Sequence, residues 1–203
     1  MAKRVLIAGI VGGIVMFFWG FAWHELLGLG LVGIKDMPSE QAIVATMKAN
    51  VPERGMYMVP GMNIPANATS EQKKAAEEAA MKKAAAGPTA LLIYSPSGNA
   101  MTPRMLMTEA GTDIVQALLV AFLLAQTGLR RFGSRLGFAF VIGLVATITT
   151  NISYWNWFGF PTDYTIGNMS YLILGYFLIG LVVASIVKGS AGSPRPQAAS
   201  AAA

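Results

Sequence analysis

The fold of this chain is decided by Asn151-Ile152-Ser153-Tyr154-Trp155-Asn156-Trp157-Phe158-Gly159-Phe160-Pro161-Thr162-Asp163, which lies between two long apolar runs. Amphipathic aromatic rings such as its two tryptophans collect where a bilayer meets water. Pro161 predicts the end of one element, and Thr162 or Asp163 is placed to cap the next. We therefore interpret the stretch as a turn at a membrane surface that joins two spanning helices.

Within this turn, Trp155 and Trp157 flank Asn156. In an extended segment both rings face one way and Asn156 faces the other. We expect Asn156 to turn inward and to hydrogen-bond the backbone freed by Pro161, because an unpaired polar group at that depth is costly. Gly159 is expected to supply the tight bend.

The composition supports a membrane protein. The chain has 203 residues, of which 54% are hydrophobic and 12% charged, and its mean hydropathy is +0.53. Soluble domains carry about a quarter charged residues. The absence of cysteine excludes disulfides, thiolate metal sites and cysteine nucleophiles. The pI is 9.6, but the basic residues are scattered along the chain and predict no nucleic-acid interface.

Four apolar runs are long enough to cross a bilayer, at residues 5–23, 111–129, 136–154 and 166–187. We expect the first to remain as a helix, with a cleaved signal peptide ending at Gly20-Phe21-Ala22 as the alternative. In that run Ala8 pairs with Gly12, and Gly9 with Gly13, at a spacing that lets another helix approach closely. Glycine is also common in membrane helices without such a role.

Residues 35–108 predict a small water-exposed insert. One helix is expected from Met37-Pro38-Ser39-Glu40 to about residue 50. Thr69 and Gln72 fit the capping box of a second helix, which Gly87-Pro88 ends. Residues 55–60 are predicted to be extended, and residues 90–94 to form a strand. The insert has too little core to stand alone, so we expect it to lean on the membrane surface.

The predicted fold class is an all-α integral membrane protein of four transmembrane helices with this α+β insert. Its divisions are 1–34 (first helix with an outer interfacial extension), 35–108 (insert), 109–187 (three further helices) and 188–203 (disordered tail). The N-terminal segment, the turn between the second and third spans, and the tail carry seven basic residues and no acidic one: Lys3, Arg4, Arg130, Arg131, Arg135, Lys188 and Arg195. The positive-inside rule therefore predicts both termini in the cytoplasm and the insert outside.

This topology places several polar residues at the outer membrane boundary: His24, Glu25, Glu109, Asp113, Asn151, Asn156 and Asp163. Imidazole and carboxylates could hold a divalent metal there or relay a proton. The alternative is structural anchoring, since the last three acidic residues are expected near helix N-termini, where the macrodipole favours an anion. The four tryptophans, Trp19, Trp23, Trp155 and Trp157, are expected to form an aromatic belt.

Two methionine pairs, Met56 with Met58 and Met105 with Met107, have spacings that a Cu(I) thioether site could use. Ordinary apolar packing is the alternative. No His-x-x-x-His, Glu-x-x-His or glycine-rich phosphate loop is present, so the sequence predicts no catalytic residue and identifies no cofactor.

The run from Tyr154 to Thr162, together with Tyr57-Met58-Val59-Pro60-Gly61-Met62 and Gly87-Pro88-Thr89, resembles a family of uncharacterised bacterial inner-membrane proteins with four transmembrane helices. The resemblance spans most of the chain. It implies a location in the bacterial plasma membrane and implies no catalytic residue.

The leading functional hypothesis is a non-enzymatic accessory or assembly subunit that acts through its helices and its insert. Its expected partners are the lipid bilayer and either a membrane protein or a second copy. The hypothesis rests on the small residues of the first helix and on the expectation that every charge lies at a helix end. The alternative is a metal- or small-ligand-binding protein, in which at least three of His24, Glu25, Glu109, Asp113 and Asp163 would meet.

Overall fold

The computed structural model describes residues 1–188. The chain divides into two units, which are treated separately. The helical unit combines Met1–Lys35 with the chain from Met101 onward, and the insert is Asp36–Ala100.

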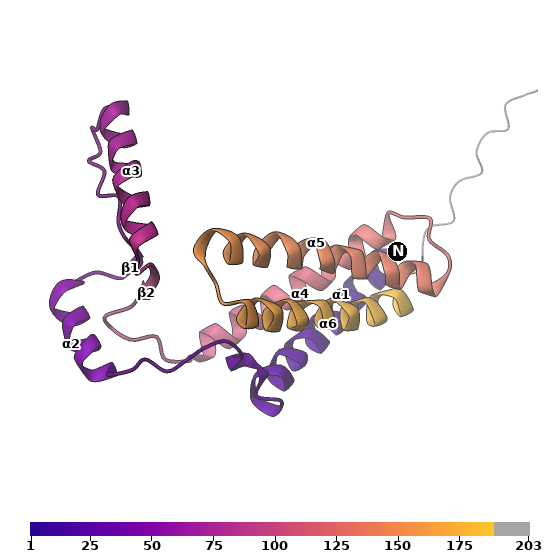
Figure 1. Ribbon diagram of the computed structural model, residues 1–203. Helices are drawn as coiled ribbons and strands as arrows, with labels where there is room; N and C mark the ends of the chain where they lie inside the picture. The colour runs from indigo at the N-terminus through magenta and orange to yellow at the C-terminus, as the bar shows by residue number, and fades with distance from the viewer. Residues whose placement is uncertain (189–203) are drawn as a thin grey trace, which may run out of the picture. The chain divides into compact units, whose positions relative to one another are not determined.

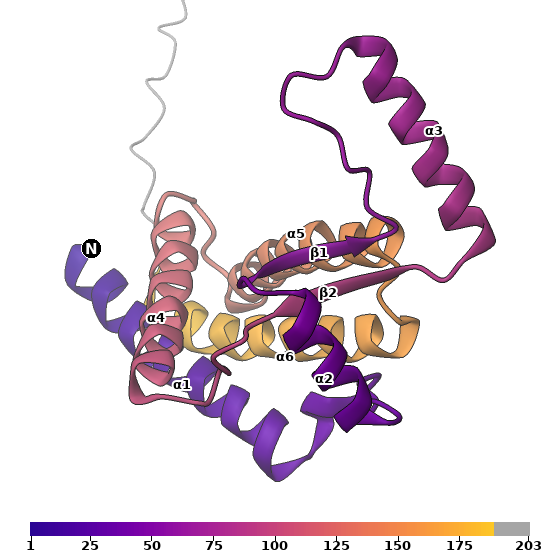
Figure 2. The ribbon, with the colours of Figure 1, turned by 90° about the vertical axis from the view of Figure 1, so that its left-hand side faces the viewer.

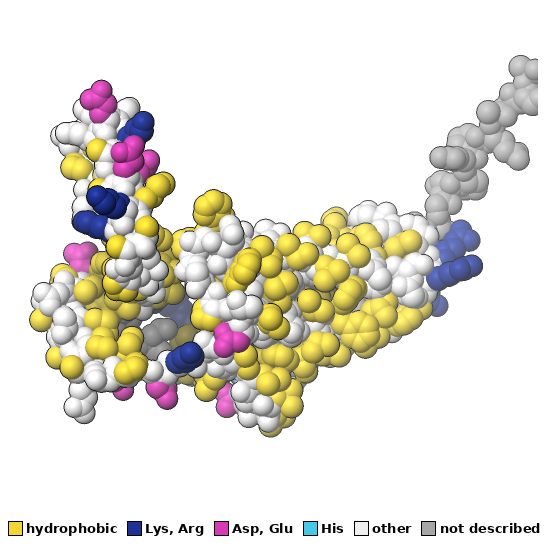
Figure 3. Space-filling view, in the orientation of Figure 1, with side chains coloured by type: hydrophobic (Ala, Val, Ile, Leu, Met, Phe, Trp, Pro, Cys, Tyr) yellow, Lys and Arg dark blue, Asp and Glu magenta, His cyan; other side chains and the backbone are white. Residues whose placement is uncertain are grey.

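The helical unit contains four long helices packed side by side (Figure 1). They are α1 (Ala2–Phe21), α4 (Pro103–Ala125), α5 (Phe132–Phe158) and α6 (Thr162–Ile186). A single π-helical turn (Ala22–Leu26) extends α1, and a 3₁₀ turn (Leu29–Leu31) follows. All four helices are long and apolar enough to cross a membrane. Apolar side chains also cover much of the unit's outer surface (Figure 3), as a lipid-facing bundle requires.

Glycines of α1 allow it to pack tightly against α4. A Cβ placed on Gly9 would overlap the Leu118 side chain, and one placed on Gly13 would overlap the backbone of Ile114. The small-residue face predicted in the first helix is therefore occupied by α4 of the same chain. These contacts also show that the two helices run in opposite directions, since Gly9 precedes Gly13 while Leu118 follows Ile114.

The turn between α5 and α6 confirms part of the sequence interpretation. Gly159 ends α5 with a φ of 68°, a conformation that glycine adopts without strain. The Trp155 indole N–H donates to the Thr162 hydroxyl across the turn, at 3.1 Å. The extended interpretation is wrong, because residues 155–157 are helical and the two tryptophan side chains therefore point about 160° apart.

Asn156 is exposed rather than turned inward, for the same reason. On a helix, the inward-facing asparagine is Asn151, which is 4% exposed and lies five residues earlier. The inward-facing asparagine is therefore Asn151, and not Asn156 as the sequence predicted.

The start of α4 differs most from the prediction. The helix begins at Pro103 rather than at Glu109. Thr102 caps it, because its hydroxyl accepts a hydrogen bond from the Met105 amide at 3.3 Å. Pro103 suits the first helical position, where no amide hydrogen bond is needed. Asp113 therefore lies in the middle of α4, and its predicted place near a helix N-terminus is wrong.

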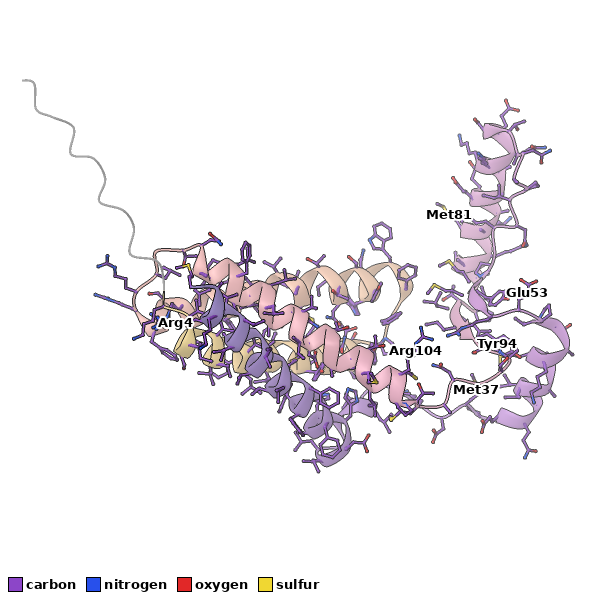
Figure 4. The ribbon with its side chains drawn as sticks, turned by 180° about the vertical axis from the view of Figure 1, so that it is seen from behind. Arg4, Met37, Glu53, Met81, Tyr94 and Arg104 are labelled. Atoms are coloured by element: carbon purple, nitrogen blue, oxygen red, sulfur yellow. The ribbon has the colours of Figure 1, made fainter. Side chains whose placement is uncertain are left out.

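The end of the helical unit that holds the N-terminus carries only basic charges, whereas the other end carries the acidic residues Glu25, Glu109 and Asp163 together with Lys35 and Arg104. Basic side chains gather at the end that holds the N-terminus, including Arg4 (Figures 3 and 4). Arg135 is buried there and donates from Nε to the Ala184 carbonyl oxygen at 3.0 Å, and from a second nitrogen to the Arg130 carbonyl oxygen. Arg195 and the predicted disordered tail, apart from Lys188, lie outside the described residues. This segregation matches the charge pattern that the sequence predicted, while the side of the membrane stays a prediction.

The insert contains α2 (Glu40–Asn50), β1 (Gly55–Val59), α3 (Ser70–Ala86) and β2 (Ala90–Tyr94). The strands pair antiparallel with Tyr57 opposite Leu92 (Figure 2). The predicted capping box of α3 is confirmed, with hydrogen bonds of 3.2 Å to the Thr69 hydroxyl and 2.9 Å to the Gln72 side chain. No residue between 36 and 100 is buried, so the insert has no core of its own.

Candidate functional site

The polar residues predicted at the outer boundary lie apart rather than in one group. His24 and Glu25 are exposed on the π-helical turn, and the His24 ring meets Tyr171 edge-on at 5.7 Å. Glu109 is exposed on α4. The Asp163 carboxylate accepts from the Tyr164 amide at 2.9 Å, which satisfies a free N–H in the first turn of α6.

Within residues 1–188, no three His, Asp or Glu side chains form a group that could hold a metal ion. The predicted convergence of three ligands from the boundary set is therefore not found. Met56 and Met58 belong to the insert, whereas Met105 and Met107 belong to α4, and all four are exposed.

The four tryptophans divide into two kinds. Trp23 is 7% exposed and packs against Trp19 and Tyr171, with ring centroids 5.5 and 5.9 Å away. The Trp19 indole donates to the Tyr171 carbonyl oxygen at 3.0 Å, which ties α1 to α6. Trp155 and Trp157 are exposed, as residues of an aromatic belt are.

The most unusual group in the helical unit is the carboxyl of Asp113. It lies ten residues after the start of α4 and twelve before its end. Its neighbour Ile114 packs on Gly13, close to the middle of the α1 span. Asp113 is 1% exposed, and its Oδ1 has no hydrogen-bond partner among the described residues. The expectation that every charged residue lies at a helix end is therefore wrong.

The backbone phase of α4 explains why Asp113 is buried. The buried residues of this helix are Asp113, Ala117, Val120, Ala121, Leu124 and Ala125, a spacing of three and four that marks one helical face. That face meets α1, because a Cβ on Gly12 would lie 3.0 Å from the Ala117 side chain. An aspartate on this stripe has no route to lipid or water except through the bundle.

Further polar side chains from α4, α5 and α6 lie inside the bundle. The Tyr176 hydroxyl donates to the Gln116 side-chain oxygen at 2.9 Å. The ring of Tyr176 packs against Gly143, where a Cβ would overlap it. Gly143 lies one helical turn before Thr147, which is fully buried and whose hydroxyl also has no partner among the described residues. Most buried polar groups in proteins are hydrogen-bonded, so the unpaired oxygens of Asp113 and Thr147 need a physical explanation.

A second pair continues this polar interior toward the turn between α5 and α6. The Asn168 amide donates to the Asn151 side-chain oxygen at 2.7 Å. The Asn151 amide in turn donates to the Thr147 carbonyl oxygen at 2.9 Å. Of the polar residues in this region, Asp113, Thr147, Asn151 and Tyr176 are buried, whereas Gln116 and Asn168 are half-buried.

Most polar side chains inside the bundle lie in one half of it, and buried Arg135 at the basic end is the exception. Beyond Asp113 toward the basic end, the buried residues of α4 are alanine, valine and leucine. They pack with Ala8 of α1 and with Ile179, Val183 and Val187 of α6 in an apolar core. Apolar residues therefore line the interior of the bundle between the Gln116–Tyr176 pair and the basic end.

Sequence reasoning named Asp113 and Asn151 but placed them at the boundary, and it missed Gln116, Thr147 and Tyr176. Thr102 followed by Pro103 is a helix-start signature that could have moved the predicted start of α4 from Glu109 to Pro103. From that start, the stripe of Asp113, Ala117, Val120 and Leu124 indicates an inward face. No sequence signal indicates that the Tyr176 hydroxyl reaches Gln116.

Comparisons of the chain with protein-family models, with curated proteins and with solved structures find no match. The resemblance inferred from the Tyr154–Thr162 run stays a prediction. Function must therefore be argued from the geometry of the two units.

Proposed function

We propose that this protein is a non-enzymatic accessory or assembly subunit of the bacterial plasma membrane, and that it binds a partner protein through its insert. The four apolar helices support a multi-pass membrane location. The single observation that carries the proposal is that residues 36–100 fold into two helices and a two-stranded sheet without burying any residue. A two-stranded sheet without a packed face is marginally stable in water, so a partner that covers it would complete the fold.

One face of the sheet formed by β1 and β2 offers the apolar surface for such a partner. Met56 pairs with Ile93 and Met58 with Leu91, and directly opposed residues project to the same side of a sheet. Met56, Met58 and Ile93 are 66%, 51% and 74% exposed. We call Met56, Met58, Leu91 and Ile93 the sheet face. Flexible methionines are common on surfaces that accept a protein partner.

The insert, rather than the small residues of α1, supplies the surface for the proposed partner. The small residues of α1 contact α4 of the same chain, so they no longer argue for a partner helix. The insert replaces them as the interacting element. The rival metal site at the outer boundary has lost support, because the described residues contain no ligand group.

Photo-crosslinking tests the proposal with a matched control. A photoreactive amino acid replaces Ile93 on the sheet face or Met81 on α3 (Figure 4), two apolar residues that are 74% and 70% exposed. In native membranes, the proposal predicts a discrete protein adduct from position 93 and a much weaker one from position 81. Adducts with lipid alone, or equal adducts from both positions, would contradict it.

A further inference from the structure

The helical unit contains a buried acid for which the proposed function gives no role. Asp113 is 1% exposed, lies at the middle of a membrane-spanning helix and has an oxygen without a partner. Ionisable residues at such depth are costly and are usually tied to a function. Because the interaction proposed for the insert does not involve α4, Asp113 is a separate problem.

We propose that Asp113 is a proton-binding site of the helical unit, filled and emptied from the end that carries the acidic residues and closed toward the basic end. On uptake, an O–H bond of hydronium breaks as the carboxyl O–H bond forms. On release, the carboxyl O–H bond breaks as water accepts the proton, and no oxidation state changes. The inference depends on the membrane location and does not depend on the partner proposed for the insert.

The surroundings of Asp113 favour a proton over a counter-charged side chain. The basic residues of α5 and of the N-terminus lie at the far end of the bundle, beyond the apolar core. At the level of Asp113, α1 contributes Gly12, Gly13 and Met16, none of which can pair with a carboxylate. A bare carboxylate without a partner is strongly disfavoured there, whereas a carboxylic acid is neutral.

The titratable groups around Asp113 come from α4, from α6 and from the π-helical turn that extends α1. Glu109 lies one turn earlier on α4, and Tyr171 and Tyr176 of α6 lie within electrostatic range of the carboxyl. Helix α1 adds only His24, at its end, where the ring contacts Tyr171. Helix α5 adds Thr147 and Asn151, which are uncharged. None of these groups is a fixed positive charge that would hold Asp113 permanently ionised.

The distribution of polar groups gives the site its direction. Exposed Glu109 and the hydrogen-bonded pair of Asn151 and Asn168 lie toward the acidic end. Toward the basic end, the Gln116–Tyr176 hydrogen bond lies about one turn from Asp113. Beyond that pair, Val120, Leu124 and Val183 are 0–2% exposed and provide no hydrogen-bonding side chain. A proton can therefore exchange on one side, and the bundle is not a through-going proton path.

Infrared spectroscopy on the full-length protein in lipid vesicles tests the site directly. The chain has three aspartates, and Asp36 and Asp163 are exposed. In wild-type protein, we expect a protonated-carboxyl C=O band that shifts when aspartate is labelled with ¹³C in its carboxyl group. The band should be missing from Asp113→Asn and retained in Glu25→Gln, which removes an exposed carboxylate at the acidic end.

The absence of an aspartate-dependent acid band at every pH, or its persistence in Asp113→Asn, would overturn the proposal. Should that variant fail to fold, the ¹³C shift in wild-type protein decides the question alone. The band is then followed in sealed vesicles of both orientations while only the external pH is changed. It should respond where the acidic end faces outward and stay constant where the basic end does.

A proton-flux measurement tests the closed side independently. Vesicles loaded with a pH-sensitive dye are given a potassium diffusion potential, and wild-type protein is compared with Asp113→Asn. Equal flux for the two proteins supports the one-sided site. A flux that wild-type protein carries and the variant loses would overturn it.

Discussion

Two asparagines of α5 show that the position of a residue on the helix decides whether its side chain is buried. Asn151 is 4% exposed and accepts a hydrogen bond from Asn168, whereas Asn156 is exposed. Both residues stand in the polar–aromatic stretch that predicts the turn, and nothing in their local composition separates them. The helical period does, because five residues rotate a side chain about 140° around the axis.

Replacing each asparagine by leucine tests this distinction. Asn151→Leu leaves the Asn168 amide without its acceptor, so we expect a loss of about 1 kcal/mol in unfolding free energy. Asn156→Leu should change it by less than about 0.5 kcal/mol, as exposed substitutions usually do. Thermal unfolding in detergent measures both, and equal effects would argue against an inward Asn151.

At the scale of elements, glycine determines how closely α1 and α4 approach. A Cβ on Gly13 would lie 2.6 Å from the Ile114 amide nitrogen, and backbone cannot move aside as a flexible side chain can. Gly13→Ala should therefore destabilise the helical unit by about 1–3 kcal/mol, as overpacking does.

Gly137 of α5 is the matched control, since a Cβ there meets nothing within 4 Å. Gly137→Ala should be neutral or slightly stabilising, because alanine is the better helix former by about 1 kcal/mol. The two variants are compared by thermal unfolding in the same detergent. If Gly13→Ala unfolds at the wild-type temperature, the close α1–α4 packing is wrong.

Helix α3 buries no residue, so its capping box contributes to its stability without support from tertiary packing. Thr69→Ala removes the acceptor of the Gln72 amide, and we expect about 1 kcal/mol of local helix stability to be lost. Hydrogen exchange of the amides that open α3 should accelerate by about fivefold, from that free energy. Thr46→Ala in α2 is the control, because Thr46 donates to the Ala42 carbonyl oxygen and caps nothing. Unchanged exchange in Thr69→Ala would exclude the cap.

Sequence reasoning predicted elements better than it predicted their phase and packing. Apolar length revealed the four spanning helices, and cap residues revealed α3 and its end at Gly87. The start of α4 was missed because Arg104 and Glu109 interrupt the apolar run, so hydropathy alone places the helix too late. That one shift concealed the mid-helix position of Asp113. The burial of Asp113 and the Tyr176–Gln116 contact depend on side-chain packing between helices, which no local pattern encodes.

At the scale of the whole molecule, the two units have contrasting physical character. The helical unit has an apolar exterior, a partly polar interior and basic residues at one end. The insert has no buried residue and contains long exposed methionines. These features fit a multi-pass membrane protein, and they are the basis of the two proposals, a partner for the insert and a proton-binding site at Asp113.

The central claim is that the helices span the membrane with the insert outside and the basic end inside. Because the chain has no cysteine, single-cysteine variants report position without background labelling. Ala85→Cys lies on exposed α3, and Ser134→Cys lies at the exposed start of α5 near the basic end. In intact spheroplasts, a membrane-impermeant maleimide should label Ala85→Cys at once and Ser134→Cys only after permeabilisation. Labelling of both before permeabilisation, or of Ser134→Cys alone, would contradict the account.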